Sequence, residues 1–239
     1  MKIRSNPQGI IKQTLFFEKR EIDGMCLDAL RKSGLLPDKP EPIRIERFIE
    51  KYFNCMVVYE DMKDGVLGCT AFNPNGSVKA VYVASALTDG SDSGRRRTSS
   101  TLAHEAGHCI MHPVLFMKDG SQMRMDFGSG PQVENLDFHD RRVLCRETDL
   151  RPSQEKRYDG RWWEYQANRA IGGFLLPRKL VEVAVNPFLT TTGSLGCQKF
   201  ARDGLDGAKA EVARLFDVNP VVAHIRLQEM YPASDQVEL

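Results

Sequence analysis

The chain has 239 residues, of which 41% are hydrophobic, so it is long enough to bury a core as one large domain or as a domain with appendages. Its 33 Lys and Arg residues against 32 Asp and Glu residues leave a net charge of +1, which excludes a global attraction to nucleic acid or to an anionic membrane. No stretch has the sustained hydropathy of a secretory signal or a membrane span, so we expect a soluble cytoplasmic enzyme.

The six cysteines are scattered along the chain and include no Cys-x-x-Cys pair. This spacing disfavours both a zinc ribbon and a dense disulfide framework. We therefore predict that most of them are buried thiols in a reducing compartment.

Two helices and a small sheet are predicted in the first part of the chain. Apolar residues at helical spacing predict a helix over 17–34, and a second helix begins after Pro42 and ends near Phe53. The strands expected after these helices are short and lie at 55–59, 65–72 and 78–83.

A loop follows the sheet and leads to a third helix. We expect the basic run Arg95-Arg96-Arg97 to lie in this solvated loop, and the cluster Thr98-Ser99-Ser100-Thr101 to supply the N-cap of the helix. The helix carries the most informative motif of the chain, His104-Glu105-Ala106-Gly107-His108, and Pro113 stops it.

Positions four apart lie on one face of a helix, so both histidines of this motif can reach one metal ion while Glu105 projects beside it. This is the His-Glu-x-x-His pattern of zinc peptidases. The alternative is a helix whose histidines are merely packed or solvated.

A catalytic zinc site typically takes a third protein ligand. The metzincin pattern would need a glycine at position 111 and a histidine at position 114, but this chain has Met111 and Val114 and is excluded from that class. His112 lies eight residues from His104, roughly 12 Å along the helix, so we expect it to be a partly exposed cation near the helix end and not a ligand.

A second helix can supply a carboxylate. The pattern from Trp162 to Pro177 is helical, and Glu164 is the best candidate for the third ligand, with an exposed helical carboxylate as the alternative. Asn168 shares the face of Glu164 and could hydrogen-bond a ligand histidine. The pair Gly172-Gly173 within this helix predicts the close approach of another helix.

The last part of the chain predicts two short helices, over 208–216 and 220–230, with the outline of a helix-turn-helix. A DNA-binding regulator is therefore a second hypothesis. The second of these helices offers few basic residues, Arg226 being the main one.

Three blocks of this sequence resemble the ImmA/IrrE family of zinc metallopeptidases, over roughly residues 40–230. They are Thr101-Leu-Ala-His-Glu-Ala-Gly-His108, then Glu164-x-x-Ala167-Asn168 running to Leu175-Leu176-Pro177, and the weaker pair 42–50 and 57–60. The resemblance implies that His104, His108 and Glu164 hold zinc (Zn2+) and that Glu105 is the general base.

The resemblance and the predicted elements together imply an α+β fold, with a small mixed or antiparallel sheet packed on a zincin-like helical core and helices at the C-terminus. We expect an N-terminal helical extension over 1–40, a metallopeptidase domain over 41–189 and a C-terminal helical region over 190–239. The domain contains an insert, about 114–160, for which the sequence predicts no firm structure. His139 and Tyr158 in the insert are candidates for stabilising the oxyanion.

The function implied by the resemblance is that of a cytoplasmic regulatory zinc endopeptidase, which cleaves a helix-turn-helix transcriptional repressor and so releases genes under stress. The alternative is a regulatory module that binds DNA or a repressor and has a zinc site but no proteolytic activity.

Overall fold

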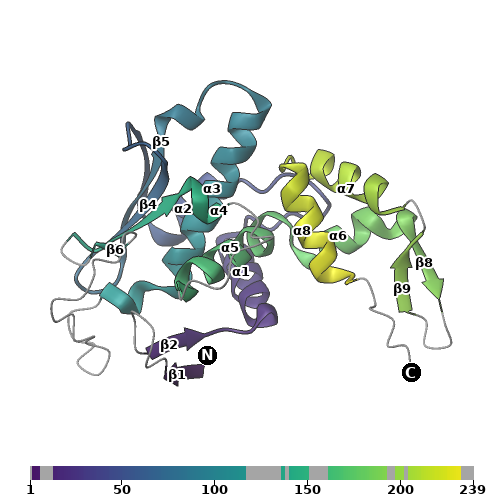
Figure 1. Ribbon diagram of the computed structural model, residues 1–239, viewed down its shortest axis with the longest axis horizontal. Coiled ribbons are helices and arrows are strands. Elements are labelled where there is room, and N and C mark those ends of the chain that lie inside the picture. Colours follow the sequence, from purple (N-terminus) through teal and green to yellow (C-terminus); the bar gives the residue numbers. More distant parts are fainter. Residues whose placement is uncertain are drawn as a thin grey trace.

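A computed structural model describes residues 2–5, 13–116, 136–137, 140–150, 161–192, 197–201 and 204–232 (Figure 1). The helices are α1 (Lys19–Ser33), α2 (Ile45–Phe53), α3 (Asp92–Met111), α4 (Glu147–Leu150), α5 (Trp162–Leu175), α6 (Arg178–Val185), α7 (Gly204–Leu215) and α8 (Pro220–Met230). The strands are β1 (Lys2–Ser5), β2 (Gln13–Phe16), β3 (Met56–Glu60), β4 (Val66–Phe72), β5 (Val78–Ala84), β6 (Leu136–Asp137), β7 (Arg142–Arg146), β8 (Leu189–Thr192) and β9 (Cys197–Phe200). This is an α+β fold, as predicted.

The main sheet is mixed and has the strand order β3-β5-β4-β7-β6. Strands β3 and β5 are parallel, whereas β4 pairs antiparallel with both β5 and β7. The predicted strands β3, β4 and β5 are confirmed. Strand β7 comes from the segment for which no structure was predicted, and its inward-facing residues Val143 and Cys145 are completely buried.

Helix α3 begins earlier than predicted. Its N-cap is Ser91, whose Oγ accepts a hydrogen bond of 2.9 Å from the backbone N–H of Gly94, so the N-cap predicted within 98–101 is wrong. Arg95 and Arg96 lie in the first turns of the helix and both pair with Asp217, at 2.6 and 2.9 Å. This shared partner stabilises a polar helical segment that sequence patterning assigned to a loop.

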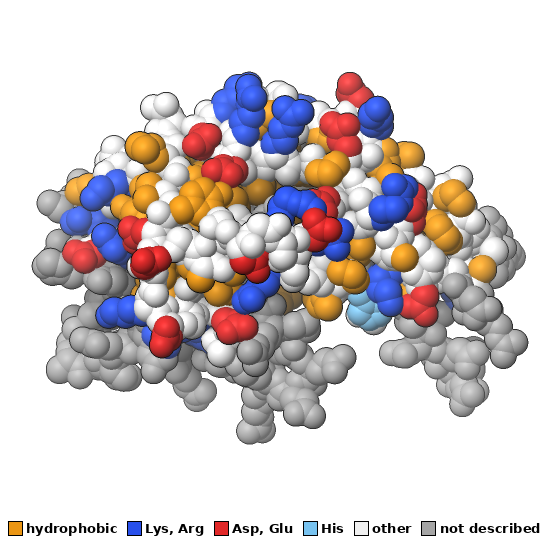
Figure 2. All heavy atoms as spheres, turned by 90° about the horizontal axis from the view of Figure 1, so that it is seen from above, with side chains coloured by type: hydrophobic (Ala, Val, Ile, Leu, Met, Phe, Trp, Pro, Cys, Tyr) orange, Lys and Arg blue, Asp and Glu red, His pale blue; other side chains and the backbone are white. Residues whose placement is uncertain are grey.

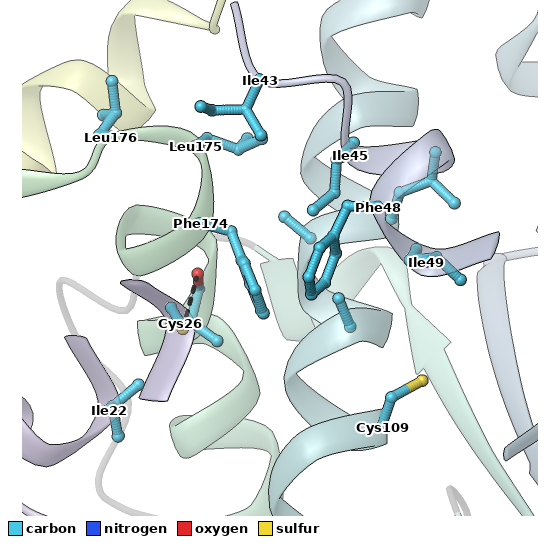
Figure 3. Close-up of a cluster of buried hydrophobic side chains, with 14 of the residues drawn as sticks. Ile22, Cys26, Ile43, Ile45, Phe48, Ile49, Cys109, Phe174, Leu175 and Leu176 are labelled. Carbon is cyan, nitrogen blue, oxygen red and sulfur yellow. Dashed lines mark hydrogen bonds between the residues drawn. The ribbon is translucent and has the colours of Figure 1, made fainter. Parts of the chain in front are cut away.

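Helices α3 and α5 approach each other closely. A Cβ atom at Gly107 of α3 would lie 2.8 Å from the Cβ of Ala170 and 3.1 Å from the Cα of Ala167, both in α5, so only glycine allows this spacing. Phe174 of α5 also packs against Phe48 of α2, with ring centroids 5.0 Å apart (Figure 3). The two helices that carry the predicted metal ligands are therefore held together by the core.

The glycine pair in α5 confirms the predicted close approach of other helices. A Cβ atom at Gly173 would lie 2.9 Å from Sγ of Cys26 in α1, and one at Gly172 would lie 3.3 Å from Cδ of Arg226 in α8. Arg226 is only 2% exposed. Its guanidinium donates to the Leu176 carbonyl at 3.1 Å and to the carboxylate of Asp23 at 2.8 Å. The main basic side chain of α8 is thus turned into the protein.

The surface charge is mixed and the cysteines are free thiols, as the near-zero net charge and the cysteine spacing predict. Basic and acidic side chains are interspersed on the face drawn in Figure 2. Within the described ranges no helix is long and apolar enough to cross a membrane. Cys26, Cys55, Cys69, Cys109 and Cys145 are thiols, not disulfides, and all of them except Cys55 are buried, as predicted.

Candidate metal centre

Helices α3 and α5 bring three predicted ligands together. Nε2 of His104 lies 3.0 Å from Nε2 of His108, and Oε2 of Glu164 lies 3.2 Å from the first nitrogen and 3.7 Å from the second. Two donors bound to one tetrahedral zinc ion at about 2.0–2.1 Å lie roughly 3.3 Å apart. The three donor atoms are therefore spaced so that they could hold one small metal ion.

These three side chains are buried, and charged neighbours shift the pKa values of Glu164 and His104 against the effect of burial. Burial by itself would raise the pKa of Glu164, but His108 and His104 outweigh this effect and lower that pKa. Burial by itself would lower the pKa of His104, but Cys145 and Glu164 outweigh it and raise that pKa. The centre therefore favours a positive charge between the donors, supplied by a proton or by a metal ion.

Asn168 sets the orientation of the first histidine. Its side-chain oxygen lies 3.0 Å from Nδ1 of His104. An amide oxygen only accepts hydrogen bonds, so Nδ1 of His104 carries a proton and Nε2 is the nitrogen that a metal ion would bind. A histidine that binds a metal ion through one ring nitrogen usually donates a hydrogen bond from the other, which fixes its orientation.

The expectation that His112 is a partly exposed cation is wrong. The side chain is completely buried, and this burial lowers the pKa of His112 to about 3, so the ring is neutral. Its Nδ1 lies 2.9 Å from Nδ1 of His108 and its Nε2 lies 3.0 Å from Oε1 of Gln166. His112 lies behind His108, on the side away from the three converging donors.

A chain of hydrogen bonds through His112 sets the tautomer of His108. The side-chain N–H of Gln166 donates to the Leu15 carbonyl in β2, so its oxygen faces His112 and accepts from Nε2–H. Nδ1 of the neutral His112 must then accept from Nδ1–H of His108. The remaining nitrogen of His108, Nε2, therefore faces the centre and is the one that a metal ion would bind, as Nε2 of His104 is.

Replacing His112 with alanine is expected to weaken zinc binding by about 10- to 100-fold, because the ring no longer orients and polarises His108. Competition with a chromophoric chelator measures this loss. His224→Ala, which removes a histidine of α8 that takes no part in this chain, is the matched control. An unchanged zinc affinity in His112→Ala would contradict the orienting role.

Strand β4 positions the carboxylate of Glu105. The hydroxyl of Thr70 donates to Oε2 of Glu105 at 2.6 Å. A Cβ atom at Gly68 would lie only 2.7 Å from Oε1, so the strand needs glycine where it passes this carboxylate. Glu105 lies beside the group formed by His104, His108 and Glu164 and is not a member of it.

The chemistry of the donor set fits zinc. Two neutral imidazoles and one carboxylate are a common protein ligand set for catalytic zinc, which also binds a water molecule. Nε2 of each imidazole faces the buried carboxylate of Glu164. Three electron-rich atoms at these distances repel one another unless a proton or a metal ion lies between them.

Sequence reasoning missed several neighbours of the centre. Thr70 carried no signal, whereas Gly68, a glycine inside a strand, could have indicated the close approach of another group. Cys145 could not be found because its strand was not predicted. Of the candidates for oxyanion stabilisation, His139 and Tyr158 lie outside the described residues.

Two comparisons with known proteins give no match. No known family model matches this chain, and no curated protein matches it.

Proposed function

We propose that this chain is a zinc-dependent endopeptidase. The observation that carries the proposal is the convergence of three metal-binding donors from His104, His108 and Glu164, with the carboxylate of Glu105 beside them. A zinc ion held by these three residues would lower the pKa of a bound water towards about 7 and would polarise the carbonyl of a peptide bond.

The residues of the chain have separate roles in such a reaction. Glu105 accepts the proton of the attacking water and passes it to the leaving amine, while the Thr70 hydroxyl holds its carboxylate in one orientation. Asn168 and His112 keep both ligand histidines in the tautomer that directs Nε2 at the centre.

The substrate part of the proposal rests on the resemblance to the ImmA/IrrE family. It implies a regulatory peptidase of the cytoplasm that cleaves a helix-turn-helix repressor and so releases genes under stress. The segment between His108 and Glu164 is longer than is usual for that family and is a departure from its pattern, whereas the α+β architecture is compatible with it.

Incubation of the zinc-loaded protein with a helix-turn-helix repressor encoded next to it tests the proposal. We expect the repressor to be cut into discrete fragments, a metal chelator to stop the cleavage and added zinc to restore it. Gel electrophoresis and mass spectrometry of the fragments measure the result. A repressor that stays intact with stoichiometric zinc present would contradict peptidase activity.

A repressor-binding module without proteolysis is the second candidate, since the burial of the centre would also suit a structural metal site. It predicts a stable complex with the uncut repressor. Its DNA-binding form is less favoured, because Arg226, the main basic residue of the predicted second helix, is buried and pairs with Asp23.

A further inference from the structure

A cavity of about 320 Å³ lies apart from the metal centre, among helices α1, α5, α6 and α8 (Figure 1). None of the residues of the metal centre lines it. Its volume is at the lower end of the range for small-molecule sites, which is about 300–1,000 Å³. The cavity is therefore large enough for a small organic ligand.

The lining of this cavity has an excess of positive charge. Only one carboxylate, that of Asp23, lines it, against the cationic side chains of Arg20, Arg178, Lys179 and Arg226. Asp23 is itself engaged, because one oxygen pairs with Arg226 at 2.8 Å and the other lies 3.8 Å from Arg178. Within the described ranges Arg20 and Lys179 have no ion-pair partner. A concave surface with unbalanced cations attracts an anion.

Arg226 brings a buried guanidinium to the lining. It is 2% exposed, its Nε donates to the Leu176 carbonyl, and its two carboxylate neighbours, Asp23 and Glu229, both approach Nη1. Nη2 has no hydrogen-bond partner among the described residues. A buried charged group that is incompletely paired is costly. An anion in the cavity would add negative charge next to this guanidinium.

Helix α6 begins at the same cavity. Pro177 is its N-cap and makes no side-chain hydrogen bond to the helix, and Arg178 and Lys179 are the first two helical residues. The first N–H groups of a helix have no partner within the helix and carry a partial positive charge. The backbone and the side chains of these two residues therefore favour the same kind of ligand, an anion.

The rest of the lining is apolar. Gly24 and Leu27 of α1 and Gly173 of α5 contribute to it. A Cβ atom at Gly24 would meet no atom within 4 Å, so α1 leaves free space where it lines the cavity. This surface suits an organic group and not a second charge.

We propose that the cavity binds a small phosphomonoester. Its phosphate lies among Arg20, Arg178 and Lys179, and its organic part covers Gly24 and Leu27. Arginine binds phosphate through two parallel hydrogen bonds, and a dianion matches several unbalanced cations better than a carboxylate does. Binding makes and breaks no covalent bond, and it does not depend on the zinc centre.

Isothermal titration calorimetry of the full chain tests the site with phenyl phosphate, inorganic phosphate and benzoate. We expect one phenyl phosphate to bind per chain. Inorganic phosphate should bind about tenfold more weakly, because it buries no apolar surface. Benzoate should bind about tenfold more weakly as well, because it makes fewer charge-assisted hydrogen bonds. Treatment of the protein with a metal chelator should change none of these affinities.

Two variants separate the charged part of the site from the apolar part. The double change Arg178→Ala with Lys179→Ala should weaken the binding of both phosphates by at least about tenfold. Gly24→Leu should weaken phenyl phosphate by about tenfold, because the new side chain occupies the free space, and should leave inorganic phosphate unchanged. Lys63→Ala, at an exposed lysine outside the cavity, is the matched control. The thermal midpoint of each variant shows that it is folded.

Absence of saturable phenyl phosphate binding, or an unchanged affinity in the folded double variant, would overturn the site. Benzoate bound as tightly as phenyl phosphate would overturn the phosphate specificity. Inorganic phosphate bound as tightly as phenyl phosphate, with no effect of Gly24→Leu, would overturn the role of the apolar lining and identify free phosphate as the ligand. Failure of the peptidase proposal would change none of these outcomes.

Discussion

Glu105→Gln is expected to stop peptide cleavage while the protein keeps its zinc. The amide cannot accept the proton of the attacking water, and general base catalysis contributes about 10²- to 10⁴-fold to the rate. The change conserves shape, so the hydrogen bond with the Thr70 hydroxyl can be kept, with the amide oxygen as acceptor. Metal analysis of the purified variant and a cleavage time course measure the two effects separately.

The control for this experiment is Glu211→Gln, which makes the same change on the surface of α7. It should cleave at the wild-type rate. Turnover retained in Glu105→Gln would show that Glu105 is not the base. Loss of both zinc and turnover would instead place Glu105 among the metal ligands.

His104→Ala and Glu164→Ala are expected to lose the metal. Each removes one of three converging donors, so zinc affinity should fall by more than the roughly 100-fold that an outer-sphere partner can contribute. The metal-to-protein ratio after dialysis measures the loss. Added zinc should raise the thermal midpoint of the wild type, through its binding to the folded state, but not that of either variant.

Asn168→Ala provides the graded control, because it removes only the hydrogen-bond partner of His104. It should weaken zinc binding by about 10- to 100-fold, and a high zinc concentration should restore occupancy. A full equivalent of zinc retained in His104→Ala or Glu164→Ala after dialysis would contradict their assignment as ligands.

The helices and strands with strong local patterns could be predicted from the sequence. Apolar periodicity located α1, α2 and α5, and Pro113 marked the end of α3. The start of α3 could not be located in this way, because Arg95 and Arg96 are stabilised there by Asp217, more than a hundred residues away. Strand β7 is short and exists through its pairing with β4, which local patterning does not report.

His112 illustrates the same limit at the centre. Its spacing from His108 correctly placed it on the same side of the helix, but a histidine near a helix end is usually solvated and not buried. Its neutral state depends on burial, on Gln166 of α5 and, through Gln166, on the Leu15 carbonyl. None of these contacts is local in the chain.

The sequence by itself determined that His104 and His108 lie together, because they are one turn apart wherever that segment is helical. The sequence also identified Glu164 and Asn168 as candidates on one face of a second helix. Only the packing of α3 against α5, at the spacing that Gly107 allows, decided that these groups meet. The position of β7, and with it the thiol of Cys145, was likewise decided by sheet pairing. Backbone periodicity is a local property, whereas the closure of a metal centre depends on distances between elements that only the folded core sets.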